Sequence, residues 1–252
     1  MGAGLDRHDA SSYPMMPLRI PLFDFPDVVL VAEELNVKRH ARFKAAKGGD
    51  IVAADGLVAD FAAGLDARLR AMFAGRQVEL VPVHALETTG VNEIPVALAR
   101  RVAHLFDISV SDSIVQTNSV GHTGASGYQR LARQALFEGD VRAGQAYCLV
   151  DDFVGQGGTL ANLIGYINAR GGEVVGAFAL AGKPYSAILA PDAAIIAGLR
   201  RKHGQALEIW WRGRFGFGFD CLTRSEARYL ENSPDADTIR SRLVEAGFAD
   251  GT

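Results

Sequence analysis

Apolar residues along the chain follow two spacings, one typical of strands and one typical of helices. Four short apolar runs predict strands that are buried on both faces: 28–32, 78–83, 145–151 and 173–181. The region 56–74 has large apolar side chains at four-residue steps, and 94–106 also predicts a helix. Because strands alternate with helices, we predict an α/β fold with a parallel sheet covered on both faces.

Capping and turn residues mark the ends of several of these elements. Asp55 is a candidate N-cap of the helix at 56–74, and Gly75 is a candidate stop. The glycine-rich stretch 118–129 predicts a surface loop. The pattern predicts further helices at 160–169, 193–203 and 223–231, and further strands at 113–117 and 207–211.

The composition of the chain indicates its partners and its cellular compartment but not a particular reaction. With 22% charged residues and a formal net charge of −3, nothing favours nucleic acid or a membrane as a partner. The two cysteines are isolated, which favours a reducing compartment, and no apolar stretch reaches 18 residues. We therefore expect a cytoplasmic protein with an irregular arm at 1–27, an α/β core at 28–182 and a cap at 183–252.

Residues 147–160 contain the strongest functional pattern in the chain. An apolar strand leads into Asp151 and Asp152, then into a glycine-rich turn, and then into a helix that begins near Thr159. This order places two carboxylates and several backbone N–H groups at the carboxyl edge of a parallel sheet, where ligands bind in such folds. A sugar phosphate would satisfy both halves, with hydroxyls on the aspartates and phosphate on the helix N-terminus.

Two other interpretations of the pattern remain open. A dinucleotide site would need a third glycine at the position of Leu160, and the two aspartates would repel a pyrophosphate. The second alternative is an ordinary turn between strand and helix with a chance pair of aspartates.

The stretch resembles the phosphoribosyl-pyrophosphate (PRPP) binding motif of type I phosphoribosyltransferases. The resemblance implies a Rossmann-like parallel-sheet core of that type, with a small hood from the N-terminal or C-terminal segment. By position, it implies that Asp151 and Asp152 act on the ribose. The residues implied to hold the 5-phosphate are Gly155, Gln156, Gly157, Gly158 and Thr159.

The same resemblance implies roles for residues outside the motif. Thr88, Thr89 and Gly90 would hold pyrophosphate together with Mg²⁺, which would be bound mainly through substrate oxygens, with the two aspartates as candidate further ligands. A flexible loop would close over the site with His122 as a catalytic cation and Arg130 as a substrate contact. Tyr185 and Trp211 would stack on the acceptor in the hood.

The resemblance predicts an enzyme that transfers 5-phosphoribosyl from PRPP to a nitrogen of a small-molecule acceptor and releases pyrophosphate. Gly155 disfavours 6-oxopurine acceptors, because that branch has an aspartate at this position. The alternatives are a non-catalytic PRPP- or nucleotide-binding regulator and a PRPP hydrolase. A homodimer is possible, and the basic segment 38–47 is expected to be a solvated face.

Overall fold

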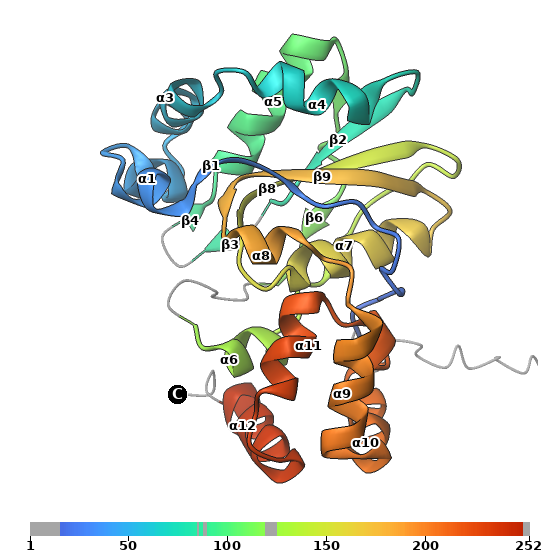
Figure 1. The fold of residues 1–252 in the computed structure, drawn as a ribbon. Helices are drawn as coiled ribbons and strands as arrows, with labels where there is room; N and C mark the ends of the chain where they lie inside the picture. The colour runs from blue at the N-terminus through green and yellow to red at the C-terminus, as the bar shows by residue number, and fades with distance from the viewer. Residues whose placement is uncertain (1–15, 85, 88–89, 119–124, 249–252) are drawn as a thin grey trace, which may run out of the picture.

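A computed structural model describes residues 16–84, 86–87, 90–118 and 125–248 (Figure 1). Its centre is a five-stranded sheet in the order β1-β9-β8-β2-β5, in which every neighbouring pair is parallel. The predicted α/β class with a parallel sheet is therefore confirmed. The strands are β1 (Val29–Glu33), β2 (Val78–Pro82), β5 (Ser109–Val110), β8 (Ala146–Val154) and β9 (Glu173–Gly182).

The chain leaves β2 and β8 in opposite directions. From β2 it passes through α5 (Ile94–Phe106) to β5 on one side, and from β8 it passes through α7 (Gly158–Asn168) to β9 on the other. The right-handed crossover rule then puts α5 and α7 on opposite faces of the sheet, and two separate apolar clusters reflect this. The carboxyl ends of β2 and β8 thus form a topological switch point, which is where open α/β sheets bind ligands.

The face that carries α5 is also covered by four helices from the first third of the chain. They are α1 (Glu34–Arg39), α2 (Phe43–Lys47), α3 (Ile51–Phe61) and α4 (Leu65–Phe73). The prediction of one helix at 56–74 is wrong, because α3 ends at Phe61 and a second helix, α4, begins at Leu65. Between them lies Gly64, whose φ of 73° favours glycine. The N-cap is Asp50, whose side chain accepts a hydrogen bond from Ala53 N, and not Asp55.

The last part of the chain forms a helical unit below the sheet in Figure 1. Its core contains Trp211 and includes Leu131 from α6, an earlier segment of the chain. The predicted strand at 207–211 is wrong: Leu207, Trp211 and Phe215 lie at helical four-residue steps and are buried together within α10. The unit comprises α6 (Gly127–Ala132), α9 (Ala193–His203), α10 (Gln205–Phe215), the 3-10 turn η1 (Phe219–Cys221), α11 (Arg224–Glu231) and α12 (Ala236–Phe248). The short helix α8 (Pro184–Ala187) precedes it and packs through Ala187 in the apolar cluster on the α7 side of the sheet.

The remaining strands form two short antiparallel pairs. They are β3 (Leu86–Glu87) with β4 (Gly90–Val91), and β6 (Val115–Gln116) with β7 (Phe137–Glu138). The predicted helices 94–106 and 193–203 are confirmed, and 224–231 begins with a reciprocal capping box between Thr223 and Glu226. Among the described residues, no helix has the length and apolar character needed to cross a bilayer.

Candidate functional site

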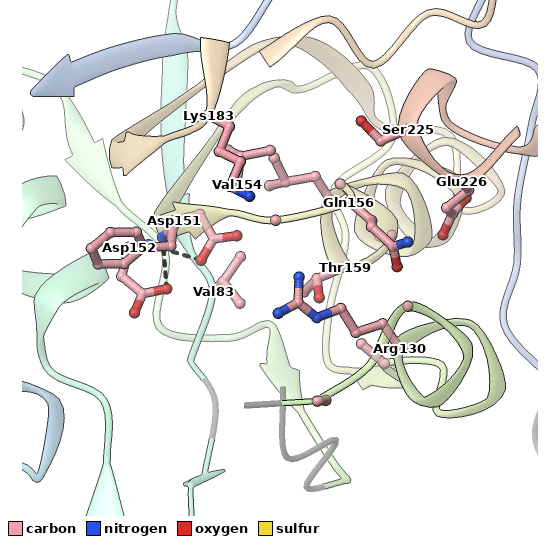
Figure 2. A pocket seen from close by; sticks show the side chains of 18 of the residues that line it. Val83, Arg130, Asp151, Asp152, Val154, Gln156, Thr159, Lys183, Ser225 and Glu226 are labelled. Carbon is pink, nitrogen blue, oxygen red and sulfur yellow. Dashed lines mark hydrogen bonds between the residues drawn. The ribbon is translucent and has the colours of Figure 1, made fainter. Parts of the chain in front are cut away.

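A cleft of about 970 Å³ opens at the carboxyl ends of β2 and β8 (Figure 2). One wall comes from α1 and α2, and the opposite wall comes from α6, α7 and α11. The tip of β8 and the turn after it lie between these walls. Residues that are far apart in the sequence therefore meet at the motif, from 34–47 in α1 and α2 to 225–232 in and after α11.

Both aspartates lie on a strand, because β8 continues past its predicted end at Asp151 to Val154. Neighbouring strand residues point to opposite faces of a sheet. Leu149 packs in the cluster under α7, whereas Val150 packs in the cluster under α5. The same alternation sends Asp151 toward the α7 side and Asp152 toward the α2 and α5 side, and Figure 2 shows the two carboxyls turned apart.

Asp152 is held by three hydrogen-bond donors. Its Oδ2 accepts from Lys47 Nζ and from Asn92 Nδ2, both at 2.8 Å, and its Oδ1 accepts from Phe153 N at 2.8 Å. Burial alone would raise the pKa of Asp152, but Lys47 and Asn92 stabilise the carboxylate and lower its pKa. Asp152 is therefore an anchored, ionised carboxylate.

Asp151 has a different environment although it is the adjacent residue. It is 7% exposed, and its Oδ1 accepts a hydrogen bond from Asp152 N at 2.8 Å. Burial raises the pKa of Asp151 well above its usual value, and the negative charge of Asp152 raises this pKa further. Both effects shift the Asp151 carboxyl toward its neutral form, and the group faces the central space of the cleft, toward Arg130 (Figure 2).

The turn after β8 presents the start of α7 to the cleft. Gly157 is the N-cap, with a φ of 80° and no side chain to cap the helix, so among the described residues no side chain accepts from the first N–H groups of this 11-residue helix. A side chain at this position would also collide with Leu189. Arg130 lies against the same turn, since a Cβ at position 155 would be 2.8 Å from its Nη1.

A buried ion pair supports this turn from below. Arg19 donates to both carboxylate oxygens of Glu226 at 2.6 and 2.9 Å, and the two side chains are 0% and 2% exposed. Arg19 also donates to Asn162 in α7 and to the carbonyl of Gly158. The pair joins the N-terminal arm, the turn and α11. Sequence analysis missed it because no local pattern connects residues 207 positions apart.

The cleft is rich in positive charge although the chain is slightly acidic. Within the described residues, seven basic side chains line it against four acidic ones. The acidic set includes Glu226, which is paired with Arg19, and Asp152, which is paired with Lys47. The basic residues are Lys38, Lys44, Lys47, Arg130, Arg133, Lys183 and Arg228. An anionic ligand is therefore the one that the cleft suits best.

The structure separates the predicted site residues into three groups. Those that line the cleft are Arg130, Asp151, Asp152, Gly155, Gln156, Gly157, Gly158, Thr159 and Tyr185. Trp211 is 0% exposed inside the helical unit, so its predicted stacking role is wrong. Gly90 lies against the backbone of Gly48 and does not line the cleft. His122, Thr88 and Thr89 lie outside the described residues.

The basic segment 38–47 is largely a solvated face, as expected, because Lys38, Arg39, Arg42 and Lys44 are exposed. Lys47 is the exception: its side chain is only 18% exposed and is bonded to Asp152. The neighbouring Phe43 packs edge-on against Phe153, with ring centroids 5.6 Å apart. The basic composition of the segment could have suggested an anion site, but no spacing in it pointed to β8.

Comparison with known proteins gives two curated relatives, while no family model matches the chain. The chain is 38% identical over 229 residues to Protein TraN of Escherichia coli, a match that covers 90% of this chain and 51% of TraN. It is 38% identical over 146 residues to an uncharacterized protein of Haemophilus influenzae, covering 57% of this chain and 32% of that protein. The chain thus spans about half the length of TraN and about a third of the Haemophilus protein.

These relatives contradict the predicted identity. Neither bears a phosphoribosyltransferase description, and no family model of that kind matches. The assignment to that family is therefore wrong, together with the predicted phosphoribosyl transfer and its alternative, a PRPP- or nucleotide-binding regulator. The motif does not identify the family, because the switch point of any parallel sheet can combine a strand, an acidic residue and a glycine-rich helix start. The chain is similar in sequence to parts of Protein TraN and of the Haemophilus protein.

Proposed function

We propose that the cleft binds a small phosphorylated molecule, with the phosphate on the 155–159 turn and a hydroxyl-bearing part beside Asp151. One observation carries this proposal: the uncapped N-terminus of α7 opens into a cation-rich cleft at the switch point of the sheet. Backbone N–H groups at a helix start favour an anion because they are unsatisfied donors at the positive end of the helix dipole.

The surrounding side chains support a phosphate at this position. Arg130 lies against Gly155, and its guanidinium is directed toward the space in front of Thr159 (Figure 2). Gln156 belongs to the same turn and lines the cleft, and the NH₂ group of its side-chain amide can donate a hydrogen bond to an anion. Donors from the helix start, from Thr159 and from Arg130 would then meet the phosphate oxygens from different directions.

Asp151 supports a ligand with hydroxyl groups. An ionised carboxylate beside the turn would repel a phosphate, but a neutral carboxyl does not, and it can both donate and accept a hydrogen bond. Its raised pKa therefore makes the acidic residue compatible with the anion site next to it. Vicinal hydroxyls of a polyol or sugar offer the matching donors and acceptors.

The helical unit would act as a cap on this ligand. Arg130 from α6 and Ser225 and Arg228 from α11 line the cleft opposite α1 and α2. The core would supply the phosphate turn, and the cap would supply charge and selectivity. Turnover of the bound molecule, a homodimer and a cytoplasmic location stay predictions.

Isothermal titration with inorganic phosphate, glycerol 3-phosphate, glucose 6-phosphate and glucose tests the proposal. We expect the phosphorylated compounds to bind and glucose not to bind. Arg130→Met should weaken phosphate binding about tenfold or more, since it removes a charge-assisted hydrogen bond. Arg76→Met is the matched control, because Arg76 pairs with Glu173 and does not line the cleft.

Two results would overturn the proposal. One is the absence of binding for every phosphorylated compound at millimolar concentration, and the other is equal loss of affinity in the Arg130 and Arg76 variants. Phosphorus NMR of the same mixtures checks turnover, because a chemical reaction at the ester would produce a new resonance.

A further inference from the structure

We propose that the Lys47 ammonium takes the place of a divalent cation beside Asp152, so that phosphate binding in the cleft does not require Mg²⁺. This inference rests on the proposed function, because it concerns how the same cleft balances the charge of its ligand. It also changes the expectation, drawn from the resemblance, that Mg²⁺ would accompany the ligand.

The position of Lys47 is the first support. Its Nζ lies 2.8 Å from Asp152 Oδ2, and the two side chains are 18% and 10% exposed. Both residues line the cleft, so the ammonium neutralises the carboxylate and still borders the space for the ligand. A cation held by the chain itself therefore occupies the place next to Asp152.

The coordination of Asp152 is the second support. Its Oδ2 also accepts from Asn92 Nδ2, and its Oδ1 accepts from Phe153 N. Asn92 is oriented by Ile94 N, which donates to Asn92 Oδ1 at 3.2 Å, so the amide presents its NH₂ and not its oxygen to Asp152. Mg²⁺ prefers oxygen ligands in a near-ideal octahedron. The carboxylate here is instead surrounded by donors.

The wider set of acidic residues offers no metal site built from protein ligands alone. The described part of the chain contains no group of three or more His, Cys, Asp or Glu side chains placed to hold a metal ion. The other nearby carboxyl, Asp151, points away from Asp152 toward the α7 side of the cleft (Figure 2). The two aspartates therefore do not converge on one cation.

The helix that carries Lys47 is fixed to the edge of the sheet, which keeps the ammonium in place. Ala46 is fully buried, and its carbonyl accepts from Glu93 N at 3.3 Å. Phe43 packs against Phe153, the residue after Asp152. Both ends of this five-residue helix are thus attached to the segments that hold the other two partners of the site, Asn92 and Asp152.

Two titrations of the intact chain test the inference. The first measures phosphate binding once in EDTA and once in an excess of Mg²⁺. We expect the same affinity within about twofold. The second measures Mn²⁺ binding with no phosphate present, and we expect none in the wild-type cleft. Because the second titration needs no ligand, it still decides the metal question if phosphate does not bind at all.

Variants of two nearby basic residues sharpen the test. Lys47→Ala removes the ammonium, so phosphate binding should weaken about tenfold in EDTA and recover when Mg²⁺ is added. Arg39→Ala is the matched control, because Arg39 lies at the end of α1 and does not line the cleft, and it should bind phosphate equally with and without Mg²⁺. A wild-type phosphate affinity that falls tenfold or more in EDTA would overturn the inference, as would Mn²⁺ binding by the wild-type cleft. If Lys47→Ala does not fold, the two wild-type titrations alone decide.

Discussion

Arg19→Met should destabilise the whole chain, because it removes one partner of the buried ion pair with Glu226. Arg19 is 0% exposed and Glu226 is 2% exposed at the side chain, so neither charge can turn to water without opening the structure. Breaking a buried pair by removing one partner costs about 3–5 kcal/mol. Arg19 also donates to Asn162, Gln134 and the carbonyls of Cys221 and Gly158, so the upper half of this range is expected.

Urea denaturation measures the effect, and the chain has a convenient internal probe. Its two tryptophans, Trp210 and Trp211, both lie in α10, so their fluorescence reports on the helical unit, whereas far-UV circular dichroism reports on the whole fold. With an m-value of about 3 kcal/mol/M, the loss would lower the urea midpoint by about 1 M or more. The fluorescence transition should move at least as far as the circular dichroism transition, because the pair attaches α11 to the core.

The double variant Arg19→Met/Glu226→Leu separates the charge from the packing. Replacing both partners by apolar residues leaves no buried unpaired charge, so more than half of the lost stability should return. A loss below about 1 kcal/mol for Arg19→Met would refute the reasoning. So would a double variant that is less stable than Arg19→Met alone.

Three further predictions concern other parts of the molecule. Arg200 and the other donors around Glu208 lower its pKa from 4.5 to about 2, so its stabilising effect is complete above pH 4.5 and is lost as the pH falls toward about 2. Glu208→Gln should lower the free energy of unfolding by about 1–2 kcal/mol at pH 7, after allowance for the solvent screening of the partly exposed Arg200. Urea denaturation at several pH values should then show a smaller loss of stability below pH 4.5 in the variant than in the wild type. Trp211→Ala should cost about 3–5 kcal/mol of stability and leave phosphate affinity unchanged, because the indole is buried away from the cleft. A fall in phosphate affinity at constant stability would contradict this placement. Gly157→Ala should weaken phosphate binding in calorimetry and lower the melting temperature, because its φ of 80° and its contact with Leu189 exclude a side chain. Wild-type affinity in that variant would show that the turn does not hold the anion.

The sequence alone predicts the fold class and the edge of the sheet at which the cleft opens, because both follow from short-range patterns. Buried parallel strands are continuous apolar runs, and β2, β8 and β9 were found within one to three residues of their ends. The strand predicted at 207–211 failed because two adjacent tryptophans favour a strand locally, whereas the apolar positions repeat at helical steps over the longer stretch Leu207–Phe215.

The contents of the cleft could not be predicted to the same extent. Lys47, Asn92, Arg19 and Glu226 reach the motif across long sequence separations, and nothing local indicates such contacts. The family resemblance failed for a related reason. It was carried by one turn, and the same turn geometry serves any anion at the carboxyl edge of a parallel sheet.

The alternation of side chains along β8 makes this site unusually dependent on strand register. A side-chain period of two means that one residue inserted into 146–150 would move Asp151 to the place beside Lys47 that Asp152 occupies, and would move Asp152 to the place of Phe153. One residue removed would instead move Asp152 to the α7 side of the sheet and Asp151 to the place of Val150, which is buried in the apolar cluster under α5. The cleft therefore keeps one carboxyl of each kind only while the number of residues between the start of β8 and Asp151 stays fixed.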